Sequence, residues 1–184
     1  IASSVVNSSY ASSSSSLMIS KINGTITDIL HPPIAPSEIV TALALGSVAR
    51  SMIIVIVSVT FFSLFIDLPI YNFFYVFVFV FLGAFILGSI GVISGILIDK
   101  FEGQAAVTNF LVSPLALLSG TFYLTDKLPE IVQKINIANP IYHIVNTIRY
   151  GFLGVSDTSV KFGLLYLVVL SFIFWFVAYI LFAK

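Results

Sequence analysis

The chain has 184 residues, of which 59% are hydrophobic and only 9% are charged. Soluble domains carry about 25% charged residues, so this composition predicts an integral membrane protein. Its eight basic and eight acidic residues cancel, which excludes the positively charged surface typical of nucleic-acid-binding proteins. The absence of cysteine excludes disulfides, cysteine-ligated zinc and thiol catalysis within these residues.

The length allows one domain, residues 1–184, and we expect the sequence to be N-terminally incomplete because no basic leader or cleavage site precedes Ile1. Residues 1–19 are rich in serine and have two interpretations. One is a flexible linker. The other is a polar-faced membrane helix, in which hydroxyls bond back to helix carbonyls and small residues let helices approach closely. Composition alone favours neither.

Residues 20–38 are polar and contain three prolines. Thr25 and Asp28 have the spacing of a loose capping box, which predicts a short helix over 26–30. Pro32 and Pro33 would end that helix. The next helix is expected to start at residue 36 or 37, with Glu38 in its first turn, where the helix dipole favours an acid. We therefore predict a water-facing loop that contains a small helix.

Four apolar stretches follow, and they predict membrane helices over residues 39–66, 70–98, 104–124 and 162–182. The second is too long for an upright span, so it must tilt, protrude or bend near its glycines, which also form small-x-x-x-small pairs at Ala84/Gly88 and Gly91/Gly95. A short turn is expected at residues 67–69, and a tight charged turn at residues 99–103. Arg50 interrupts the first stretch; it either snorkels from a position near the loop or is a functional charge.

Residues 125–160 carry two short amphipathic patterns separated by Asn139-Pro140. Each has an apolar stripe at helical spacing, formed by Leu128, Ile131, Val132 and Ile135, and then by Ile141, Ile144, Val145 and Ile148. The second has a polar face, with His143, Asn146, Thr147 and Arg149. We expect Gly151 to end it. At about 11 residues, each helix would reach roughly 16 Å, half of a membrane core, which predicts a hairpin that dips into one leaflet or lies on it.

No motif in the sequence supplies energy or catalysis. It contains no P-loop and no H-E-x-x-H motif, and its acids lie in turns and loops. Orientation is also undecided, because alternating the spans divides the basic residues four against four. We therefore expect a transporter subunit, not an enzyme, that takes its energy from a partner chain. Four side chains could line a wet path or merely pack between helices: Asn7, Tyr10, Asn109 and Ser113.

Three segments, in order along the chain, resemble the ABC-2 type permeases, the membrane subunits of ABC exporters. The first is Lys21-x-x-Gly24-Thr25 through Leu30 and Pro33, similar to the family's loop between its second and third spans. The second runs from Ser113-Pro114 to Ser119-Gly120-Thr121-Phe122, similar to its fifth span. The third resembles its re-entrant hairpin and comprises Leu128-Pro129, Asn139-Pro140 and residues 149–154, RYGFLG.

The resemblance implies an all-α, six-span exporter fold with the first span absent and a re-entrant outer hairpin before the last span. It implies that residues 20–38 are cytoplasmic and hold a coupling helix for a separate ATPase, which binds ATP and Mg; this chain would hold no cofactor or metal. The implied coupling residues are Lys21, Gly24, Thr25, Ile29, Leu30 and Pro33. The implied hairpin, residues 125–160, includes Pro129, Asn139, Pro140, Arg149 and Gly151. The resemblance also favours a helix, rather than a linker, over residues 1–19.

The family also implies a homodimer of permeases in a bacterial inner membrane, with a path between the two copies. One position departs from its pattern: Ser20 stands where an acid often precedes the basic residue of the loop. The alternative function is a passive pore or membrane scaffold without ATPase coupling, built on the small-x-x-x-small faces.

Overall fold

The computed structural model describes residues 2–25, 34–66, 71–121 and 136–183. These residues form helices and their connections, and no strand occurs among them. The helices are α1 (Ala2–Ile22), α3 (Pro36–Ser63), α4 (Phe73–Leu97), α5 (Phe101–Val107), η1 (Thr108–Val112), α6 (Ser113–Ala116), η2 (Leu117–Thr121), α8 (Pro140–Leu153) and α9 (Val160–Phe182). The predicted helix over 26–30, the turn at 67–69 and the hairpin helix around 128–135 lie outside the described residues.

Three helices of the described chain are long and apolar enough to cross a membrane: α3, α4 and α9. They confirm the predicted spans over 39–66, 70–98 and 162–182. α3 starts at Pro36 with Glu38 in its first turn, as predicted, and the Glu38 carboxylate accepts a hydrogen bond from the Ala35 amide (3.3 Å). α4 is a single helix of 25 residues, about 37 Å long, so it must tilt in, or protrude from, a core of about 30 Å.

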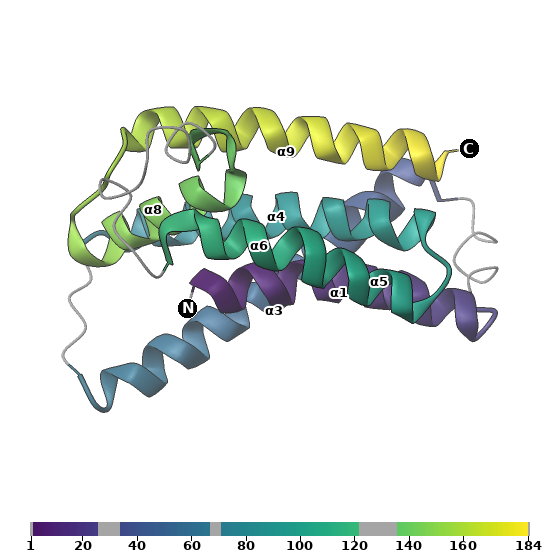
Figure 1. Ribbon diagram of the computed structural model, residues 1–184, viewed down its shortest axis with the longest axis horizontal. Helices are drawn as coiled ribbons and strands as arrows, with labels where there is room; N and C mark the ends of the chain where they lie inside the picture. Colours follow the sequence, from purple (N-terminus) through teal and green to yellow (C-terminus); the bar gives the residue numbers. More distant parts are fainter. Residues whose placement is uncertain (1, 26–33, 67–70, 122–135, 184) are drawn as a thin grey trace.

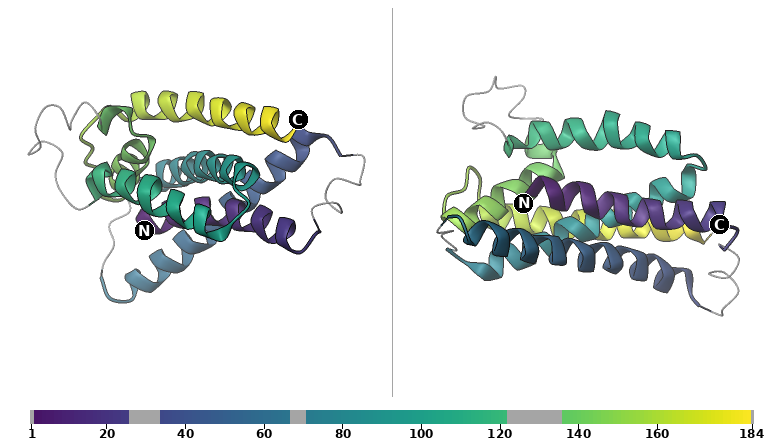
Figure 2. Two further views of the ribbon diagram at one scale, coloured as in Figure 1. Left: turned by 45° about the vertical axis from the view of Figure 1, so that its right-hand side comes forward. Right: turned by 90° about the horizontal axis from the view of Figure 1, so that it is seen from below.

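α4 is the centre of the bundle (Figures 1 and 2). It contacts α1, α3, α8 and α9, which surround it on different sides. Its glycines make these contacts close, as the small-x-x-x-small pairs predicted. A Cβ on Gly91 would lie 2.6 Å from the Tyr10 carbonyl oxygen of α1, and one on Gly88 would lie 2.9 Å from the Ser47 Cβ of α3. A larger side chain at either position would push a neighbouring helix away.

The serine-rich segment is a helix, so the linker interpretation of residues 1–19 is wrong. Residues 2–22 form α1, and two of its buried serines, Ser9 and Ser13, face α3. The Ser9 hydroxyl lies 2.7 Å from the Ser51 hydroxyl, and Ser13 pairs in the same way with Ser47. These pairs satisfy the hydroxyls inside an apolar bundle, where an unbonded polar group is costly.

The predicted span over 104–124 is a helix in which α and π segments alternate, from α5 through η1 and α6 to η2. It begins at Phe101, so the charged turn is shorter than the predicted 99–103: Glu102 and Gly103 are already helical. Pro114 lies in α6, between the two π segments. Proline lacks the amide donor of a regular α-helix, and π turns commonly accommodate such an interruption.

One prediction about α8 is wrong. Gly151 does not end the helix; Gly154 does, with a φ of +71° that favours glycine, while Gly151 packs so closely on α4 that its Cβ would lie 2.4 Å from a Val76 methyl. Three residues of the predicted polar face, His143, Asn146 and Thr147, are buried.

Candidate functional site

One end of the bundle is fixed by Lys21, near the end of α1. Its ammonium donates to the Ile96 carbonyl oxygen of α4 and to the Asp99 carboxylate, both at 2.8 Å. The hydrogen bond and the positive charge hold the pKa of the Asp99 carboxyl below its usual range. Because Lys21 also binds a carbonyl of the last turn of α4, it compensates the negative end of that helix dipole. The ends of α1 and α4 are therefore tied together.

Gly24 determines how the chain leaves α1. Its φ is +72°, in the left-handed region, and its amide donates to the Lys21 carbonyl oxygen (3.2 Å). This is how a helix often ends at a glycine. Thr25 follows in the same turn, and the predicted coupling residues Ile29, Leu30 and Pro33 lie outside the described residues.

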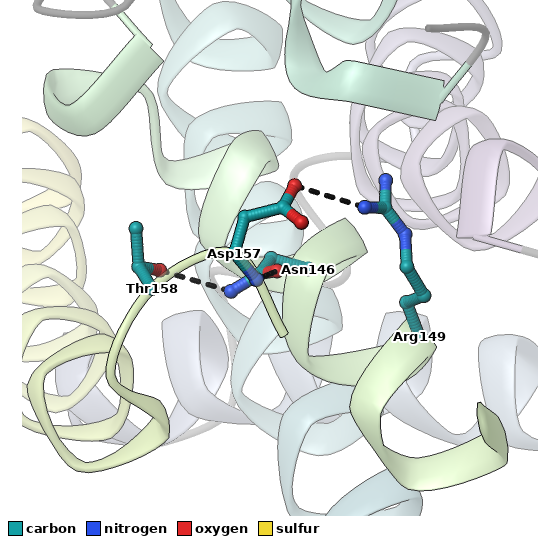
Figure 3. A network of polar contacts seen from close by, with 4 residues as sticks. All are labelled: Asn146, Arg149, Asp157 and Thr158. Atoms are coloured by element: carbon teal, nitrogen blue, oxygen red, sulfur yellow. Dashed lines mark hydrogen bonds and ion pairs between the residues drawn. The ribbon is translucent and has the colours of Figure 1, made fainter. Parts of the chain in front are cut away.

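The other end of the bundle is closed by α8 and the connection to α9 (Figure 3). The Arg149 guanidinium donates to the Asp157 carboxylate (2.9 Å). Asn146 holds the same connection twice: its side-chain oxygen accepts from the Asp157 amide (2.8 Å), and its nitrogen donates to the Thr158 hydroxyl (2.9 Å). The sequence analysis placed Asn146 and Arg149 on the polar face of this helix, and it missed Asp157 and Thr158.

Asn139 joins α8 to the irregular helix. Its side-chain oxygen accepts from the Ile141 amide (3.0 Å), which caps α8 at its start with Pro140 in the first position. Its side-chain nitrogen donates to the Leu115 carbonyl oxygen of α6 (2.8 Å). One side chain therefore caps α8 and holds it against another element. Pro129 lies outside the described residues.

His143 has a packing role. Its Nε2 lies 2.8 Å from the Ile137 carbonyl oxygen, and its ring packs against those of Phe162 and Tyr166. Burial lowers the pKa of His143, and the contact with the Ile137 oxygen offsets only part of that effect. Burial therefore favours the neutral imidazole. No group of three or more metal-binding side chains occurs in the part of the chain that the structure describes.

The four side chains predicted for a path differ in their exposure. Asn7 and Asn109 are exposed, and Ser113 is half-buried. Tyr10 is buried, and its hydroxyl donates to the Gln104 side-chain oxygen (3.1 Å), while Gln104 donates to Ser94. Tyr10 thus links α1 to α5 and α4 from inside the bundle, which favours helix packing for this residue.

A pocket that sequence reasoning missed lies between α1 and α3. It has a volume of about 240 Å³ and is lined by Ser12, Ser13, Ser16, Ala42, Leu43, Gly46 and Arg50. Arg50 was expected near a loop, but it lies well inside α3, because this helix already begins at Pro36. Ser16, one of these lining residues, is exposed. The sequence did contain a signal for this pocket: serines recur at helical spacing throughout α1, and Arg50 is the one charge well inside α3.

Comparisons with known proteins agree with this architecture. The family model described as "ABC-2 type transporter" matches residues 1–153. Similar proteins include the inner membrane transport permease YadH from Escherichia coli strain K12, Escherichia coli O157:H7 and Shigella flexneri. Each is 28% identical over 171 residues, which cover 92% of this chain and 67% of the relative. No solved structure gives a significant match. The chain therefore belongs to the ABC-2 type transporter family and is a multi-pass membrane component of a transporter.

Proposed function

We propose that this chain is the permease of an ATP-driven exporter, coupled to a separate ATPase that binds ATP and Mg. The observation that carries the proposal is the match of the ABC-2 model to residues 1–153, most of the chain. The sequence itself contains no P-loop, so hydrolysis would take place on a partner. The name of the relatives, inner membrane transport permease, supports placement in a bacterial inner membrane. In this proposal two permease copies, each of six spans, form a homodimer around the path.

The loop over residues 20–38 is the proposed point of coupling. It joins the end of α1 to the start of α3, and these helices are linked to each other by the Ser9–Ser51 and Ser13–Ser47 pairs. Lys21 ties the same end to α4. Force applied to the loop would therefore move three packed helices together, as in a rigid-body transition between two arrangements.

The α8 end is the proposed outer gate, part of a re-entrant hairpin over residues 125–160. Opening it would break the Asn139 contact with Leu115 and the Asn146 and Arg149 contacts with the α8–α9 connection. The apolar face of α8 also packs on α4, with Ile144 and Ile148 in the core, so opening would have to part α8 from α4 or move the two helices together. A passive pore is the rival function, and it would need no partner at the opposite end.

A site-specific cross-link tests the proposal. We expect Thr25→Cys in a full-length, otherwise cysteine-free permease to cross-link to the partner ATPase, because Thr25 lies in the exposed turn after α1. Val155→Cys is the matched control: it is also exposed, but it lies in the α8–α9 connection at the opposite end. The measurement is the yield of the cross-linked band after treatment of the intact complex with a short bifunctional reagent. Cross-linking from Val155→Cys alone would contradict the proposed coupling face.

A further inference from the structure

We propose that the pocket between α1 and α3 binds the anionic group of an amphiphilic molecule, with Arg50 as its counter-ion. This inference extends the proposed function, on which the assignment of that molecule as cargo rests. The binding itself requires no ATPase, so it can be measured separately.

The first argument is depth. Arg50 lies 14 residues after Pro36 and 13 before Ser63, which is about 20 Å of helix on each side. A hydrocarbon core of about 30 Å takes roughly 20 residues of helix, so a core centred on α3 places Arg50 near its middle.

The second argument is the missing countercharge. Glu38 is the one acid in α1 and α3, and it precedes Arg50 by 12 residues, about 18 Å of helix. No hydrogen bond or ion pair joins Arg50 to any described residue. An arginine at this depth is costly unless a partner or water meets it. A second copy of the chain related by a twofold axis through this face would bring another Arg50, which adds positive charge and strengthens the need for an anion.

The third argument is the lining. Ser12 and Ser16 face the pocket, and their hydroxyls make no hydrogen bond within the described chain, whereas those of Ser9, Ser13 and Ser14 on the packed face are all bonded. Hydroxyl donors beside a guanidinium suit a carboxylate or a phosphate. Gly46 adds space, because a Cβ there would meet no atom within 4 Å. Charge, donors and space therefore occur together.

Binding to the purified full-length permease in a neutral detergent tests this inference. We would titrate dioleoyl phosphatidic acid, myristate, dioleoyl phosphatidylcholine and inorganic phosphate, and count bound molecules by native mass spectrometry. The two anionic amphiphiles should bind more tightly than phosphatidylcholine. Arg50→Gln should weaken their binding about tenfold or more, because charge-assisted hydrogen bonds are lost, and Arg50→Lys should weaken it less. Lys161→Gln, at an exposed lysine of α9, should leave it unchanged.

Gly46→Phe provides an independent variant that fills the pocket and keeps the charge. It should weaken binding of the anionic amphiphiles as strongly as Arg50→Gln, with an unchanged unfolding midpoint. If inorganic phosphate displaces both anionic amphiphiles, the site recognises the anionic group without its apolar chain. The proposal that Arg50 binds an anion then stands. Wild-type affinity in both Arg50→Gln and Gly46→Phe would overturn it, and so would equal binding of phosphatidylcholine. Neither result would bear on ATPase coupling.

Discussion

Gly24→Pro is expected to abolish coupling to the ATPase while the permease still inserts and folds. Gly24 has a φ of +72°, and the proline ring fixes φ near −65°, so the chain must leave α1 in a different direction. The hydrogen bond from the Gly24 amide to the Lys21 carbonyl oxygen is also lost. The loop over residues 20–38 would then present a different surface. We expect ATP hydrolysis stimulated by the permease, and co-purification of the ATPase, to fall by at least about tenfold, a loss of roughly 1.4 kcal/mol or more in binding.

Gly24→Asn is the matched control, because asparagine tolerates the left-handed conformation better than other non-glycine residues. It should keep most of the coupling. Leu30→Asp tests the predicted short helix without changing the end of α1, and it should uncouple as strongly as Gly24→Pro. Normal recruitment of the ATPase by both Gly24→Pro and Leu30→Asp would remove the coupling role of this loop.

Gly91→Leu is expected to have the largest effect on stability. The new Cβ would lie 2.6 Å from the Tyr10 carbonyl oxygen and 3.2 Å from the Ser14 amide nitrogen. Both are backbone atoms of α1 and cannot turn aside, so α1 must move away from α4. Overpacking of a core typically costs about 1–3 kcal/mol, and here the moving element is a whole helix, which favours the upper part of that range.

The control for Gly91→Leu is the same substitution at Gly46. A Cβ at Gly46 meets open space, and replacing glycine inside a helix improves helix propensity by up to about 1 kcal/mol. Thermal unfolding of the full-length permease in detergent should therefore show a lower midpoint for Gly91→Leu and an unchanged or higher one for Gly46→Leu. Equal midpoints would mean that the close contact between α1 and α4 contributes little to stability.

The apolar spans could be predicted from the sequence because a run of apolar residues is itself the signal for a membrane helix. The serine-rich segment could not be decided by composition, since the same residues suit a linker. The deciding contacts are between helices: Ser9 and Ser13 on α1 meet Ser51 and Ser47 on α3. On each helix the two serines are four residues apart, but only the packing of the helices brings the two serine stripes face to face.

The candidate site was harder to predict for a similar reason. A polar face on a short helix suggests contact with water, yet Asn146 and Arg149 are satisfied by the Asp157 region of the following connection, which carries no periodic pattern. Gly151 and Gly154 look equally suited to end α8, and only the positive φ of Gly154 distinguishes them. Arg50 was expected beside a loop because the dense apolar run starts at residue 51. The small residues before it are also helical and packed, which places Arg50 midway along α3.

ATP hydrolysis and ion flux, measured together in vesicles that contain the full-length permease and its ATPase, test most directly whether this chain is driven by a partner. The proposed function predicts hydrolysis that rises when the permease is present and a membrane that stays closed to ions without nucleotide. Substitution of the P-loop lysine of the ATPase should abolish the hydrolysis. A permease that does not bind the ATPase and conducts ions in the absence of nucleotide would contradict the proposed function and support a passive pore.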